Sequence, residues 1–245
     1  MAAGTYAEEV NIDKDGITLK SIDGAEVTTI TASSAVATVD FIGPGSSVVT
    51  GSTLDGFTVI NEFMEGPFPV VVRLQEASGC IVRNCIIEGP SIDTVPHMSG
   101  FLVSGEHGPG VNNIIEYSTM TNCWNGVVVF APLSDGNIVR KNTIVGNSNG
   151  VVVEWEASNT LVNSNNIYDN IIVNLITDVA GPLDATNNWW GNASGPIDPA
   201  GVYTSYGATV SAMLEVLLSS VPKIIPLSKS LMVLFAITDS VKLTT

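Results

Sequence analysis

Two histidines and the carboxylates near them are the side chains in this sequence best suited to chemistry. His97 and His107 are the only histidines of the chain, and Glu88, Asp93 and Glu106 lie close to them in the sequence. An imidazole beside carboxylates suits acid–base work or metal ligation. The alternative is a pair of ordinary solvent-exposed loops, because these histidines lack metal-ligand spacing. We assign no catalytic residue and no metal ligand, and we take Asp93, His97, Glu106 and His107 as candidate binding residues.

Two tryptophans are candidates for contact with a sugar. Trp155 lies between Glu154 and Glu156, and Trp124 stands in the preceding unit of the chain. An indole offers a flat apolar face and a polar N–H, which together suit a sugar ring. Each ring could equally cover an outer face of the fold. Trp124 and Trp155 complete the set of candidate binding residues.

A repeat in the low twenties of residues must position these side chains. The segment 142–147 (NTIVGN) recurs in similar form at 165–170 (NNIYDN) and at 187–192 (NNWWGN). More degenerate copies begin at Phe57, Cys85 and Ser118. A fixed period of this size, with longer steps where residues are inserted, is typical of a solenoid.

The apolar runs of each unit predict short strands. Ile138–Val139 and Val151–Val153 are examples, and Gly, Asn and Ser interrupt such runs before a helical turn pattern can develop. Stacking of successive coils at about 4.8 Å lets each strand pair in parallel with its copy above and below. The sequence therefore predicts an all-β parallel solenoid of about seven coils over residues 1–200. Residues 201–245 are expected to form a separate cap or tail, irregular or with a short helix at 211–221.

Polar residues at the corners of the coils predict inward hydrogen-bonded ladders, because asparagine tolerates left-handed backbone and its amide can pair along the axis. The first predicted column is Ser118, Asn142, Asn165 and Asn187, and the second is Cys123, Asn147, Asn170 and Asn192. Between them an inward apolar stack is expected, made of Val59, Ile87, Met120, Ile144, Ile167 and Trp189. An inward Asn192 implies that the Asn192–Ser194 sequon carries no glycan.

A row of alternating charge is expected on the outside of the coils. It comprises Asp55, Arg83, Glu116, Arg140 and Asn163. In a parallel ladder, opposite charges on neighbouring strands attract. We expect exposed pairs that each stabilise by a few tenths of a kcal/mol and help to fix the register.

The repeat resembles the right-handed parallel β-helix proteins of the pectate-lyase-like superfold. The opening segment 2–12 (AAGTYAEEVNI) looks like a first coil of secreted members, and 187–196 (NNWWGNASGP) looks like a closing coil of bacterial and archaeal surface proteins. The resemblance implies a right-handed β-helix and an extracellular or cell-surface location. For an enzyme it would imply a polysaccharide lyase, hydrolase or epimerase. No catalytic residue of such enzymes can be carried over to a position here.

Three insertions break the tight repeat and are the predicted place of any site. They span residues 63–69, 90–99 and 104–110, and both histidines fall within them. Insertions in adjacent coils should lie side by side, and solenoid binding faces are commonly built from such loops.

The composition of the chain limits the classes of ligand and partner that it can bind. The net charge is −15, with 9 Lys and Arg against 24 Asp and Glu, which argues against nucleic acid and against unassisted binding of polyanions. Ca²⁺ could bridge to a polyanion, but the sequence has no recognised calcium motif and we assign no cofactor. The apolar stretch 213–237 contains two prolines and two lysines and is too interrupted to span a membrane.

The three cysteines, Cys80, Cys85 and Cys123, are expected to be buried free thiols rather than disulfides. No signal peptide is recognised at the start of the sequence, so we expect that a secreted form has lost it by processing. We expect a non-catalytic extracellular module that binds carbohydrate or a neighbouring surface protein, or that stacks end to end with another chain. The alternative is a polysaccharide lyase, hydrolase or epimerase with its site at the insertions.

Overall fold

The computed structural model describes most of the chain before residue 196. The described residues are 1–33, 36–43, 47–62, 68–90, 97–177, 179, 183–192 and 195. The predicted cap or tail at 201–245, its possible helix, and Asp93 lie outside this set. No helix in the described part is long and apolar enough to cross a membrane.

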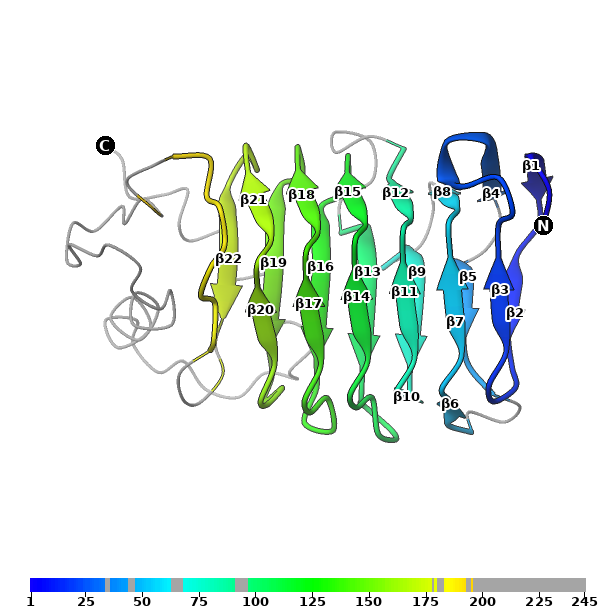
Figure 1. Cartoon of the computed structure of the whole chain (residues 1–245). Helices are drawn as coiled ribbons and strands as arrows, with labels where there is room; N and C mark the ends of the chain where they lie inside the picture. The colour runs from blue at the N-terminus through cyan, green and yellow to red at the C-terminus, as the bar shows by residue number, and fades with distance from the viewer. Residues whose placement is uncertain are drawn as a thin grey trace. The chain divides into compact units, whose positions relative to one another are not determined.

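The chain winds through three parallel sheets in turn (Figure 1). Sheet A contains β1 (Gly4–Ala7), β4 (Thr28–Ala32), β8 (Thr58–Asn61), β12 (Ile86–Glu88), β15 (Thr119–Thr121), β18 (Thr143–Val145) and β21 (Asn166–Tyr168). Sheet B contains β2 (Val10–Ile12), β5 (Ala37–Phe41), β9 (Val70–Gln75), β13 (Ser99–Ser104), β16 (Asn125–Phe130), β19 (Asn149–Glu154) and β22 (Val173–Thr177). Sheet C contains β3 (Thr18–Lys20), β7 (Thr53–Asp55), β11 (Ile81–Arg83), β14 (Ile114–Glu116), β17 (Ile138–Arg140) and β20 (Leu161–Asn163).

Two short strands and one helical turn complete the described elements. They are β6 (Val49–Thr50), β10 (Ala77–Ser78) and the 3-10 turn η1 (Ala25–Val27). One coil runs from a strand of sheet C to one of sheet A and then one of sheet B, as β11, β12 and β13 do. Each strand pairs in parallel with its counterpart one coil away, for example Phe101 with Val72 and Val127. The predicted parallel β-solenoid is confirmed, with seven strands each in sheets A and B and six in sheet C.

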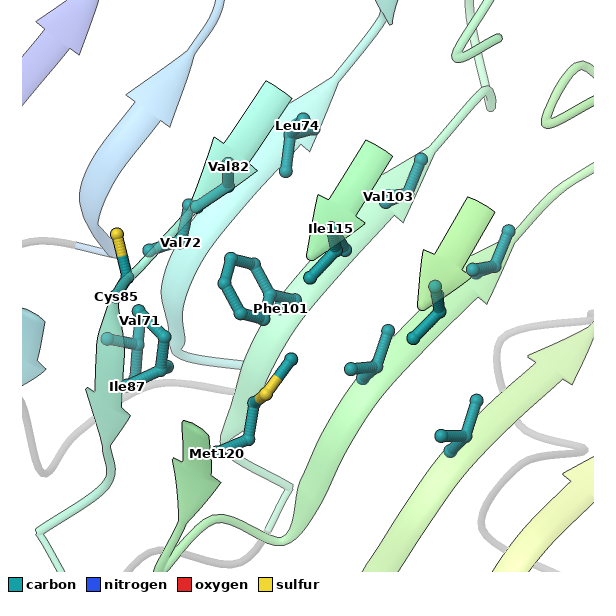
Figure 2. Close-up of a cluster of buried hydrophobic side chains, with 14 of the residues drawn as sticks. Val71, Val72, Leu74, Val82, Cys85, Ile87, Phe101, Val103, Ile115 and Met120 are labelled. Atoms are coloured by element: carbon teal, nitrogen blue, oxygen red, sulfur yellow. The ribbon is translucent and has the colours of Figure 1, made fainter. Parts of the chain in front are cut away.

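The core is a stack of aliphatic and aromatic side chains inside the coils. Figure 2 shows Phe101 from sheet B, Ile115 from sheet C and Met120 from sheet A pointing into the same interior. All three are buried, as are Ile87, Ile144 and Ile167 of the predicted inward stack. Burial of each such side chain stabilises the fold by about 1.5–3 kcal/mol.

The corner between sheets C and A carries the first predicted ladder. Asn142 Oδ1 accepts from the Ser118 N–H at 3.0 Å, and Asn165 Oδ1 accepts from the Asn142 N–H and amide at 3.0 and 3.1 Å. Ser118, Asn142 and Asn165 are buried. The left-handed backbone belongs to the residue before each rung, as with Lys141 (φ 57°) before Asn142. The prediction that one asparagine serves as both turn and rung was therefore wrong.

The last rung of this ladder is Asn188, and the prediction of Asn187 was wrong by one residue. Asn188 Oδ1 accepts from the Asn165 N–H at 2.8 Å, while Asn187 takes the left-handed turn position with φ 59°. Trp189 therefore bridges to Asn166 on the outer face and is 46% exposed. Trp190 packs against the core in its place.

The second predicted column is confirmed for three of its four members. Asn147 Oδ1 accepts from the Cys123 N–H at 3.1 Å, and Asn170 Oδ1 accepts from the Asn147 N–H at 3.1 Å. The Asn170 amide then donates to Asn174. Asn192 is exposed, so it is not an inward rung. The burial expected of Asn192 therefore cannot be the reason for an unmodified Asn192–Ser194 sequon.

A third ladder, at the corner between sheets B and C, was not predicted. Asn113 Oδ1 accepts from the Cys80 N–H at 3.0 Å, and Asn137 Oδ1 accepts from the Asn113 N–H at 2.9 Å. In each of the three ladders, one polar side chain accepts a hydrogen bond from the backbone N–H of a cysteine. The pairs are Ser118 with Cys85, Asn113 with Cys80, and Asn147 with Cys123.

All three cysteines are buried and free, as predicted. Burial raises the pKa of the Cys85 thiol to about 11 and that of Cys123 to about 12, and it also raises the pKa of Cys80. These thiols are therefore protonated at neutral pH and serve as small apolar members of the core.

The outer charge row has the predicted register but not the predicted exposure. Arg83 pairs in the sheet with Asp55 and Glu116, and Glu116 pairs with Arg140. Asp55 and Glu116 are only 3% and 8% exposed. The reason is that each long guanidinium lies over its carboxylate, at 3.1 Å for Arg83–Asp55 and 2.8 Å for Arg140–Glu116.

Candidate functional site

Three aromatic rings from successive coils meet where the chain enters sheet B. The His97 ring centroid lies 5.9 Å from that of Phe68 and 5.5 Å from that of Trp124, with tilts of 59° and 55°. Phe68 is 52% exposed, and the other two rings are half-buried. We call these three residues the aromatic edge. It brings together two of the predicted binding residues, His97 and Trp124.

Strand register explains why these rings meet. Phe68 and His97 each stand two residues before a strand of sheet B, and β9 and β13 are paired in register from Val70 and Ser99. Trp124 directly precedes the next strand, β16. His97 has φ 74°, a left-handed conformation that costs a residue other than glycine roughly 1–2 kcal/mol. This left-handed conformation forms the turn by which the chain passes from the second insertion into β13.

The third insertion lies elsewhere, so the predicted convergence of all three was wrong. Residues 97–99 lead into β13, whereas Glu106 and His107 follow the other end of the same strand and are exposed. A six-residue strand separates the two ends by roughly 16–20 Å. His97 and His107 therefore cannot act on one small ligand.

Trp155 also lies at this other end of sheet B. Its ring packs on Phe130 with a centroid distance of 4.6 Å. Nearby in the chain, hydrogen bonds from Ser158 and Asn159 lower the pKa of Asp135, a half-buried residue of the same turn region. These contacts hold the turns after β16 and β19 together. Trp155 thus joins a second aromatic pair and not the aromatic edge.

The buried carboxylates Asp40 and Asp55 on the described coil faces are held by cations. The charge of Arg73 is paired with Asp40 on sheet B, and both Lys20 and Arg83 pair with Asp55 on sheet C. Burial alone would raise the pKa of Asp55, but hydrogen bonds from Asn84 and Lys20 and the charge of Arg83 bring it below its usual value. A carboxylate fixed in this way is a poor proton acceptor near neutral pH.

The described residues do not form a metal-binding cluster. Within them, no three His, Cys, Asp or Glu side chains gather where they could hold an ion. The aromatic edge offers rings and one imidazole, which suits stacking and hydrogen bonding.

Phe68 is the member of the aromatic edge that sequence reasoning missed. The available signal was positional, because Phe68 lies near the end of the first insertion just as His97 lies near the end of the second. It was passed over because a phenyl ring has no titratable or ligating atom.

Comparison with known proteins identifies the repeat. The family model described as "Right handed beta helix region" matches residues 69–211. A search of curated proteins finds no match. Among solved structures, two crystal structures of the pectin methylesterase from Aspergillus niger, in a penultimately deglycosylated and a deglycosylated form, align with 16% identity and TM-scores of 0.37 and 0.38. Each alignment covers 91% of this chain and 86% of that one, and nothing about the activity of this chain follows from it.

Proposed function

The chain belongs to the right handed beta helix family, and on that premise we propose that it is a non-catalytic extracellular module that binds an uncharged polysaccharide at the aromatic edge. The ligand lies across successive coils, against Phe68, His97 and Trp124. The solenoid is the rigid support of this edge.

One observation carries the proposal, namely three partly exposed aromatic rings on three adjacent coils. Sugar rings present patches of C–H groups, and these pack on aromatic faces while the hydroxyls remain in water. Ring centroids spaced at 5.5 and 5.9 Å form a short track along the stack of coils. Aromatic side chains on a rigid support lose little conformational entropy on binding.

Charge favours an uncharged ligand over a uronate polymer. The chain carries a net charge of −15, and a polyanion would be repelled unless cations lined the edge. Among the described cations, Lys20, Arg73, Arg83 and Arg140 are all paired with carboxylates. Lys141 lies over the Tyr117 ring, at the corner between sheets C and A.

The same pairing favours binding over catalysis. A lyase, hydrolase or epimerase needs a carboxylate or cation that is free to transfer a proton or to stabilise charge. In the described part of sheet B, the outward pair Asp40–Arg73 is closed on itself by two hydrogen bonds. A turnover assay on acidic and neutral polysaccharides separates the two functions.

The test is a glycan array probed with wild type, Trp124→Ala and Tyr117→Ala. Tyr117 is the matched control, because it is an exposed aromatic residue at another corner of the solenoid. We expect neutral polysaccharides to bind, and Trp124→Ala to weaken binding roughly thirtyfold, or about 2 kcal/mol. Tyr117→Ala should bind as wild type does.

Three outcomes would contradict the proposal. One is equal binding by Trp124→Ala and wild type while both remain folded. A second is release of products from a polysaccharide, which would make the chain an enzyme. Preference for polygalacturonate over neutral glycans would reject the assigned ligand class.

A further inference from the structure

The outer face of sheet C carries two parallel columns of side chains. The first column contains Thr18, Thr53, Ile81, Ile114, Ile138 and Leu161, and the second contains Lys20, Asp55, Arg83, Glu116, Arg140 and Asn163. The four aliphatic residues of the first column are half-buried. No described segment forms a second layer over this face. Parallel sheets are usually covered on both faces.

The charged column alternates in sign along the stack of coils. Read from Asp55 through Arg83 and Glu116 to Arg140, it is minus, plus, minus, plus. Arg83 and Arg140 keep 40% and 38% of their side chains exposed although each binds a carboxylate. Arg140 donates only to Glu116 Oε2, and no hydrogen bond from a described residue reaches Glu116 Oε1.

Such a column complements itself when it is reversed. A two-fold axis that runs parallel to the strands, between the coils of Arg83 and Glu116, turns minus-plus-minus-plus into plus-minus-plus-minus. Arg83 then faces Glu116 of a second copy, and Asp55 faces Arg140. The same rotation places the aliphatic column against itself, with Ile81 opposite Ile114. An axis along the solenoid would instead oppose charges to aliphatic groups.

From this complementarity we infer that sheet C is the interface of an antiparallel homodimer. An isologous contact of this kind uses one patch of both copies. The net charge of −15 opposes association elsewhere, whereas the charged column of sheet C has three cations and two carboxylates.

The size of the face sets the expected strength. Strands of three residues cover about 10 Å, and six coils span about 24 Å. This area is small beside the roughly 800 Å² per partner of a stable complex. The dimer is therefore weak, with a Kd on the order of 10–100 µM.

Sedimentation of the full chain over a wide concentration range tests the interface. Wild type should pass from monomer to dimer near that Kd. Ile114→Lys should weaken the dimer on the order of a hundredfold, because each lysine is set against Ile81 of the other copy, close to the axis and one coil from the second lysine. Thr119→Lys is the control, since Thr119 lies on the outer face of sheet A, five residues away. A wild type that stays monomeric up to 1 mM (roughly tenfold above the expected Kd) would overturn the inference. So would equal loss of the dimer in both variants.

Charge swaps test the pairing itself. The double variant E116R/R140E keeps the internal ion pair but makes the row minus, plus, plus, minus, which repels its own reversed copy. The quadruple variant D55R/R83E/E116R/R140E restores alternation. We expect the dimer Kd of the double variant to be about a hundredfold higher than that of wild type, and the dimer Kd of the quadruple variant to return to the wild-type value. Circular dichroism melting confirms that each variant is folded. Dimerisation of the folded double variant at the wild-type Kd would contradict the pairing.

Discussion

Two corners of the same solenoid use similar residues for different ends. At the corner between sheets C and A, a left-handed turn residue and an inward rung recur, with Lys141 and Asn142 as one pair. At the corner between sheets A and B, the rungs Cys123 and Asn147 are also inward, but upstream coils carry the insertions 63–69 and 90–99, which contain Phe68 and His97.

The difference shows where a solenoid can vary. From β7 onward the first corner has a fixed length of two residues. Its polar side chains are bonded within the ladder, so a change there affects the fold. The second corner tolerates extra residues because only its rungs and strands are tied to the neighbouring coils. The aromatic edge lies at the variable corner, which separates binding from stability.

Removing a ladder amide should have the largest effect on stability. Asn142→Ala deprives the Ser118 N–H and the Ile115 carbonyl of their partner, and each orphaned buried group costs about 1–3 kcal/mol. We expect a loss of about 3 kcal/mol in the free energy of unfolding, measured by urea denaturation. Asn163→Ala, on the outer face of β20 and two residues before the rung Asn165, should change it by less than about 0.5 kcal/mol. Equal effects of the two variants would erase the distinction between the corners.

Much of the fixed corner could be predicted from sequence, because a solenoid repeats one local solution. The period places Ser118, Asn142 and Asn165 in one column. The match between six-residue segments failed at the next coil, where Asn187 and Asn188 are chemically identical and only the backbone decides which one turns. The step from Asn165 to Asn188 is 23 residues, as is the step before it. The residue type could not show this.

The aromatic edge was predicted only in part, since insertions have no repeat to read. His97 and Trp124 were chosen for their chemistry, and Phe68 was missed. The third insertion was misplaced because the strand expected between the second and third insertions was not counted as a separation between them. The burial of Asp55 and Glu116 was missed because outward direction was equated with exposure.

An acid titration of stability should show a smaller effect, confined to sheet C. The folded-state pKa of Asp55 lies below its usual value of about 3.9. Its contribution is therefore fully present above that value and is lost as pH falls through the folded pKa. The difference in unfolding free energy between wild type and Asp55→Asn should be about 1 kcal/mol at pH 7. It should shrink below about pH 4. A difference that grows in acid would reverse the assigned sign.

Shortening the variable corner should have the smallest effect on stability. Deletion of 91–96 leaves residues 89, 90, 97 and 98 between β12 and β13, one more than the three residues that join β15 to β16. We expect the thermal midpoint to change by only a few degrees, because long surface loops add little to stability. Deletion of Asn122, in the neighbouring short turn, is the control and should destabilise the fold strongly. Unfolding by the first deletion would show that the insertion is structural.

Affinity electrophoresis tests the separation of binding from fold most directly. Wild type, Trp124→Ala and Tyr117→Ala are run through gels that contain hydroxyethyl cellulose or polygalacturonate, and urea denaturation of the same samples gives their stability. We predict that hydroxyethyl cellulose retards wild type and Tyr117→Ala but not a fully folded Trp124→Ala, and that polygalacturonate retards none. The account would be contradicted if hydroxyethyl cellulose retarded wild type and Trp124→Ala equally, or if it retarded none of the three proteins.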